Sequence, residues 1–127
     1  MLYSEITIGG KDLKLRLDAK GCIGLERKLG KSPLTIFTDS TGNIPKLEEL
    51  IMVLHCSLQK YQQGYTEDKA YELYDEYVEE GNTFTDFIPL VMDIFKVSGF
   101  FKENDIEKAQ VDAEKKQMAV VKNSKDA

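Results

Sequence analysis

The chain has 127 residues, enough for one domain with a buried core and too few for a sizeable second one. Its 42% hydrophobic and 31% charged residues are ordinary for a soluble globular protein. The formal net charge of −5 argues against nucleic acid as a partner, because phosphate binding needs clustered Lys and Arg. No apolar run reaches the roughly 20 residues that span a bilayer, and no secretory signal follows Met1, so we expect no membrane insertion and a cytoplasmic location.

An N-terminal β-hairpin is indicated by apolar and polar residues that alternate over residues 2–17. Between the two predicted strands, Gly9-Gly10-Lys11-Asp12 supplies the positive φ values of a tight turn. An isolated hairpin is marginal in water, so its Leu and Ile face must pack on other elements.

The first predicted helix begins after the cap residue Asp18 and ends at Gly30. Gly21 and Gly24 inside it cost stability, but a glycine also lets another backbone come close. We therefore expect a short helix that depends on tertiary contacts.

A connector and a central helix should follow. Ser32 and Pro33 begin a helical turn that places Phe37 in the core. The longest apolar stripe then runs from about residue 44 to about residue 63, which predicts the central helix. Its main members are Leu47, Leu50, Ile51, Leu54 and Leu58.

Two more helices are predicted, one over residues 66–80 and one from Thr83 or Thr85 to about Ser98. The first has apolar residues, Val78 among them, on one face and carboxylates on the other. For the second, Thr85 is the easier cap, because Pro89 then falls in the first turn, where its missing N–H matters least.

These patterns predict an α+β chain that is predominantly α, with an N-terminal β-hairpin packed on a small bundle of about four helices. We place this domain at residues 1–103. Residues 104–127 are rich in charge and poor in apolar residues, which predicts a disordered or frayed C-terminal tail.

We find no motif for catalysis, metal or cofactor binding. His55, the single histidine, has no nucleophile at triad spacing, and we interpret it as a half-buried packing residue with one hydrogen bond. Cys22 and Cys56 are far apart at apolar positions, which favours reduced core thiols. Gly30-Lys31-Ser32 lacks the upstream glycine and the strand of a phosphate-binding loop. The sequence therefore favours a chain that is not an enzyme.

Two regions are candidates for binding other proteins. The carboxylates of residues 66–80 form either an ordinary solvated face or a docking surface for a basic partner. The Phe-rich stretch that ends at Phe100 and Phe101 is explained first by core packing and second by an exposed patch at the end of the domain. The residues that we predict for partner contact are Tyr71, Glu72, Asp75, Glu79, Phe95, Phe100 and Phe101.

Several segments resemble the tail assembly chaperones of long-tailed phages and prophages of Gram-positive bacteria. They read ITIGGKDLKLRL at 6–17, CIGLERKLGKSPL at 22–34, LHCSLQKY at 54–61, LYDEY at 73–77 and FIPLVMDIFKVSGFF at 87–101. The resemblance covers about residues 2–102 and lies in hydrophobic patterns with interspersed charges.

The resemblance implies a protein that holds the long helical tape measure protein in the host cytoplasm until the tail tube polymerises around it. It implies tail tube protein as a later partner, and weak self-association would let several copies cover one client. The family supplies no catalytic residues, and a frameshifted longer form would continue after Phe101. The alternative hypothesis is a minor structural protein of the particle, such as a tail completion or head-tail joining protein.

Overall fold

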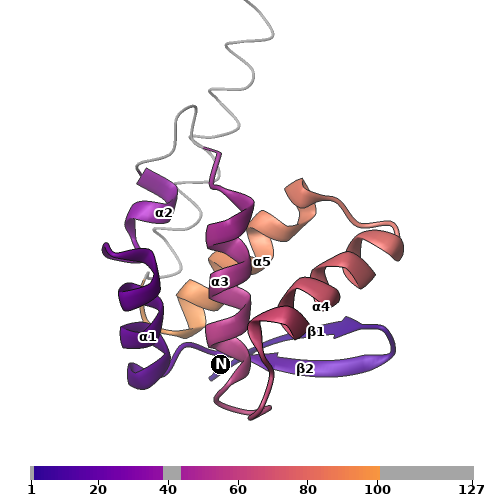
Figure 1. Cartoon of the computed structure of the whole chain (residues 1–127), viewed down its shortest axis with the longest axis horizontal. Coiled ribbons are helices and arrows are strands. Elements are labelled where there is room, and N and C mark those ends of the chain that lie inside the picture. Colours follow the sequence, from indigo (N-terminus) through magenta and orange to yellow (C-terminus); the bar gives the residue numbers. More distant parts are fainter. Residues whose placement is uncertain (1, 39–43, 101–127) are drawn as a thin grey trace, which may run out of the picture.

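The computed structural model describes residues 2–38 and 44–100, and the C-terminal tail predicted for residues 104–127 lies outside them. The elements are β1 (Ser4–Ile8), β2 (Lys11–Leu15), α1 (Ala19–Leu29), α2 (Thr35–Thr38), α3 (Leu47–Leu58), α4 (Glu67–Glu79) and α5 (Phe84–Val97). Figure 1 shows α3 between α1 and α4, with α5 behind it and the hairpin across one end of the helices. The predicted class, a predominantly helical α+β fold with an N-terminal hairpin, is confirmed. None of the described helices is long and apolar enough to cross a bilayer.

The hairpin turns on two residues rather than the four predicted. Gly9 and Gly10 have φ values of 59° and 75°, and positive φ at both positions gives the turn whose twist matches antiparallel strands. Lys11 and Asp12 consequently belong to β2. Leu2, the first residue of the alternating stretch, precedes β1 and is exposed.

The chain that leaves the hairpin is fixed to the helices by backbone hydrogen bonds. The N–H of Arg16 donates to the carbonyl of Ser57 at the end of α3 (2.9 Å), and the N–H of Leu17 donates to Oγ of Ser98 (2.8 Å). Leu17 is also buried. The hairpin therefore docks where α3 and α5 end. An isolated hairpin is only marginally stable in water, so it needs such a contact.

Helix α1 has the predicted ends. The Asp18 side chain accepts from the N–H of Gly21 (2.7 Å), and Gly30 ends the helix with a φ of 69°. A Cβ on Gly21 would stand 3.3 Å from the carbonyl oxygen of Cys56, so this glycine does allow α1 to approach the backbone of α3. Ile23 is an exposed apolar residue of this helix.

Helices α2 and α3 are both shorter than predicted. Helix α2 begins at Thr35, because Ser32 and Pro33 form a turn before it. Helix α3 begins only at Leu47, since the preceding Lys46 is extended and provides no side-chain cap. Its buried residues are Leu50, Ile51, Val53, Leu54, Cys56, Ser57 and Leu58.

Helix α4 begins at the predicted cap, where Oγ1 of Thr66 accepts from the N–H of Lys69 (3.2 Å). Its buried residues are Ala70, Leu73, Tyr74 and Tyr77. Val78 was expected among them, but its exposed fraction is 43%. The apolar face of α4 is therefore narrower than the sequence pattern indicated.

Helix α5 is capped by Thr83, so the preference for Thr85 was wrong. The Thr83 hydroxyl accepts from the N–H of Asp86 (3.2 Å), while the Asp86 carboxylate accepts from the N–H of Thr83 (2.9 Å). This capping box satisfies two N–H groups at once, which favours the earlier start. Pro89 then lies inside the helix and leaves the carbonyl of Thr85 without its helical partner. Thr85 is exposed, where water can replace that bond.

The end of α5 places an aromatic ring on the core. Gly99 has a φ of 91°, and the N–H groups of Gly99 and Phe100 donate to the carbonyls of Lys96 and Phe95 (3.1 and 3.0 Å). This pairing is the Schellman motif, which brings the residue after the glycine back onto the last turn. The rings of Phe95 and Phe100 are accordingly 5.0 Å apart.

We predict that Thr83→Ala lowers the free energy of unfolding by about 1 kcal/mol, because it removes the capping hydroxyl of α5. Urea denaturation followed by circular dichroism measures this loss. The matched control is Thr85→Ala, which changes an exposed threonine of the first turn and should leave stability nearly unchanged. Equal losses in the two variants would contradict the assignment of the cap.

Candidate functional site

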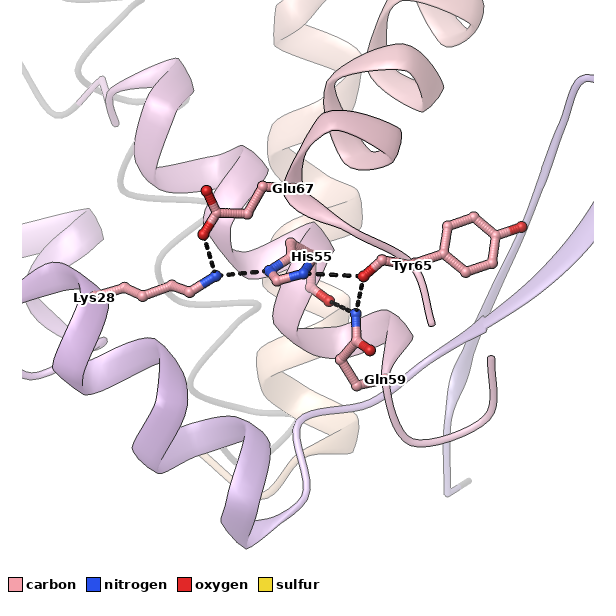
Figure 2. Close-up of polar contacts among 5 residues, drawn as sticks. All are labelled: Lys28, His55, Gln59, Tyr65 and Glu67. Atoms are coloured by element: carbon pink, nitrogen blue, oxygen red, sulfur yellow. Dashed lines mark hydrogen bonds and ion pairs between the residues drawn. The ribbon is translucent and has the colours of Figure 1, made fainter. Parts of the chain in front are cut away.

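A small recess lies on the surface where α1, α3 and α4 meet. It is lined by Lys28, Ile51, Met52, His55, Glu67 and Tyr71. Three helices thus supply its walls, with polar groups at one end and apolar groups beside them. The polar end is shown in Figure 2.

Both ring nitrogens of His55 have partners within the chain. Nε2 lies 3.0 Å from the carbonyl oxygen of Tyr65, and Nδ1 lies 2.7 Å from Nζ of Lys28. A neutral ring with its proton on Nε2 satisfies both, because Nε2–H donates to the carbonyl and Nδ1 accepts from the ammonium. Burial first, and the charge of Lys28 second, lower the pKa of His55 below its usual value. The histidine therefore has two hydrogen bonds rather than the one expected.

Lys28 joins α1 to α4 across α3. Its ammonium donates to Glu67 (2.6 Å) as well as to His55, and the hydrogen bond lowers the pKa of the Glu67 carboxyl. Gln59 completes the group by donating to the backbone carbonyl of Tyr65 (2.6 Å), as Figure 2 shows. Lys28 and Glu67 were not among the predicted site residues, because nothing in the sequence relates two side chains on separate helices to His55.

This arrangement supports a structural tie better than acid–base chemistry, since Lys28, His55 and Glu67 are already paired with other groups of the chain. The neighbouring Cys56 is a buried free thiol, and burial raises its pKa, which disfavours the reactive thiolate. Cys22 is also a free thiol, but it is half-buried against the core rather than a core residue as expected. Within residues 2–38 and 44–100, no group of three or more His, Cys, Asp or Glu could hold a metal ion.

The outer side of α4 lies beside the recess, and Tyr71 belongs to both. We call it the α4 face, and its members are Tyr71, Glu72, Asp75, Val78 and Glu79, all of them exposed. Tyr71 and Val78 have exposed fractions of 47% and 43%, and with Asp75 they recur at four and three residues, so they share one side of the helix. Four of the predicted contact residues thus lie together here.

Helix α4 is strongly acidic. Residues 67–79 contain six carboxylates against Lys69 alone, a formal charge of −5. In the part of the chain that the structure describes, no ion pair or hydrogen bond engages the side chains of Glu72, Asp75 or Glu79. Like charges three and four residues apart repel on a helix, so this face favours a cationic neighbour.

The three phenylalanines predicted for partner contact do not form a comparable surface. Phe95 has no exposed area and lies against the rings of Phe37 and Phe100, at centroid distances of 5.5 and 5.0 Å. Phe95 is therefore a core residue, in agreement with core packing as the first explanation of the Phe-rich stretch. Phe100 is half-buried on it, and Phe101 lies outside the described residues.

Comparison with known proteins gives a family without an assigned role. Residues 3–125 match the model of DUF6096, described as a family of unknown function. No curated protein and no solved structure matches the chain. The match includes both the described domain and most of the C-terminal residues beyond it.

We predict that stability falls as the pH is lowered from about 7.5 to about 5.5, across the ordinary pKa of histidine near 6.5. The folded-state pKa of His55 is depressed, so in this range the unfolded chain takes up a proton that the folded chain does not. Urea denaturation at several pH values measures the effect.

His55→Gln is the matched variant, because His55 is the single histidine of the chain. Its stability should change less than that of the parent chain over the same range. The lowered pKa of the Glu67 carboxyl makes stability depend on pH only at more acidic values, so Glu67 does not contribute to the change over this range. A parent and a variant with parallel pH profiles would rule out this role of His55.

Proposed function

The chain belongs to the DUF6096 family, and for it we propose a non-catalytic function as a tail assembly chaperone of a phage or prophage that binds the tape measure protein. The observation that carries the proposal is the α4 face. Tyr71 and Val78 are exposed there in helical register, beside carboxylates without partners among the described residues.

Such a face suits an amphipathic helix as its partner. Tyr71 and Val78 are seven residues apart, about two turns of α4, so both can contact the apolar row of a second helix, and an aromatic residue such as Tyr71 contributes a large contact area. The recess beside Tyr71 is lined in part by Met52 and Ile51, which adds apolar surface next to the α4 face. The surrounding carboxylates favour basic residues at the edge of the partner's apolar row.

The identity of the client rests on the resemblance of residues 2–102 to tail assembly chaperones. Before the tube forms, a tape measure protein exposes long apolar helix faces that aggregate. A chaperone needs only to cover these faces reversibly, which a surface of two apolar residues and several charges permits. Copies that associate weakly along one client gain from effective concentration, and tail tube protein then displaces them in the host cytoplasm.

The proposal predicts that a long helical tape measure protein is encoded near this gene and that co-expression with this chain keeps that protein in the soluble fraction. Tyr71→Lys together with Val78→Lys should weaken binding at least about tenfold, because each removes an apolar contact and adds a charge. The measurement is the soluble yield of the long protein and its co-purification with the chain.

The control is Ile23→Lys, since Ile23 is an exposed apolar residue of α1, outside the α4 face. It should leave the soluble yield unchanged, and circular dichroism checks that each variant folds. A long protein whose solubility is the same with and without the chain refutes the chaperone function. Recovery of the chain from purified particles instead supports a minor structural role.

A further inference from the structure

We propose that the basic end of the chain, residues 115–127, binds the α4 face of the same molecule and competes there with other partners. The inference concerns regulation of the surface used in the proposed function and rests on that function for its biological meaning. The contact itself can be tested without any client. We call residues 115–127 the basic segment.

The α4 face calls for a cationic and partly apolar occupant. Glu72, Asp75 and Glu79 repel one another along the helix, and no described side chain neutralises them. Tyr71 and Val78 add exposed apolar area within the same face, and a tyrosine ring also attracts an ammonium group. A segment that combined lysines with short apolar side chains would match both properties.

The basic segment has this composition. Residues 102–114 contain two Lys and five Asp or Glu, whereas residues 115–127 contain four Lys and a single Asp. The formal charges of these two segments are therefore −3 and +3. Residues 102–127 together have no net formal charge, but their negative and positive charges are separated along the sequence. Between Lys116 and Lys122 the sequence is Gln-Met-Ala-Val-Val, which places apolar residues between the lysines. The family match runs to residue 125 and thus includes this segment.

The basic segment can reach the α4 face from the end of the described domain at Phe100. Residues 101–114 span at most about 46 Å when extended, at roughly 3.3 Å per residue. As a flexible chain they would span about 20 Å. A domain of about 100 residues has a radius of gyration near 13 Å, so every face of it is within range.

Attachment to the same chain makes a weak contact sufficient. A connection of this length would hold the two surfaces at an effective concentration on the order of millimolar, far above the concentration of separate copies. The contact lies between solvent-exposed charges, so salt weakens it. Any partner that uses the α4 face must then displace the basic segment. The apparent affinity of that partner equals its intrinsic affinity multiplied by the fraction of molecules in which the basic segment is detached from the face.

The test uses the full chain, labelled with ¹⁵N, and compares the amide signals of α4 in two variants. The first neutralises the basic segment with Lys115→Gln, Lys116→Gln and Lys122→Gln. The matched control is Lys102→Gln with Lys108→Gln, which neutralises lysines of the acidic half. We expect the amide chemical shifts around the α4 face to change in the first variant only. The size of this change should not depend on protein concentration.

A second measurement adds a fluorescently labelled peptide of residues 115–127 to each protein. The variant with a neutralised basic segment should bind this peptide about three to ten times more tightly than the parent chain, because its own segment no longer occupies the face. Glu72→Lys with Asp75→Lys should abolish peptide binding to either protein.

Unchanged α4 signals in the first variant, or equal affinities for the peptide, would overturn the proposal. Shifts that grow with protein concentration would also overturn it, since they would place the contact between copies. None of these results bears on solubilisation of the long helical protein, so the two proposals can fail separately.

Discussion

The structure depends on the burial of α3. An apolar helix of this kind is stable only when other elements surround it, and seven of its twelve residues are buried. Gly21 lets α1 lie close to its backbone, and the N–H of Arg16 attaches the hairpin to the carbonyl of Ser57 near its end. Helices α4 and α5 also pack against it. Each neighbour thereby gains a fixed place from contact with the same helix.

This arrangement explains why the exposed surfaces of α1 and α4 differ in their polar contacts and charge. Helix α1 is joined to α4 by Lys28, whose ammonium reaches Glu67 over the ring of His55. Helix α4 buries only a narrow row of residues against the rest of the domain, and it turns both its remaining apolar residues and most of its carboxylates outward. The face that we assign to binding is thus the side of α4 that the other described elements leave exposed, and its composition is suited to another helix.

The sequence allowed the elements to be predicted where local chemistry decides them. Positive φ at Gly9 and Gly30 and the cap at Thr66 depend on the residue itself and its near neighbours. The prediction failed where two local preferences compete, as at Pro89, and where the width of a buried face depends on the neighbouring helix, as at Val78. The cluster around His55 could not be predicted at all, because its members meet only after three helices have packed. The expectations about partners and client remain proposals, since they concern molecules beyond this chain.

The placement of the hairpin has a consequence for the order in which the chain can acquire its structure. The N–H of Gly9 donates to Glu80, and the N–H of Leu17 donates to Ser98, 71 and 81 residues further along. Because synthesis proceeds from the N-terminus, both acceptors leave the ribosome long after the strands do. Helix α3 is made earlier and can already contact β2, but until Glu80 and Ser98 follow, the hairpin lacks these two bonds, and a hairpin with few partners is marginal in water. The hairpin precedes all the helices in the chain but gains its full set of contacts among the last, so its leucine side chains stay accessible to holding factors of the cell for much of translation.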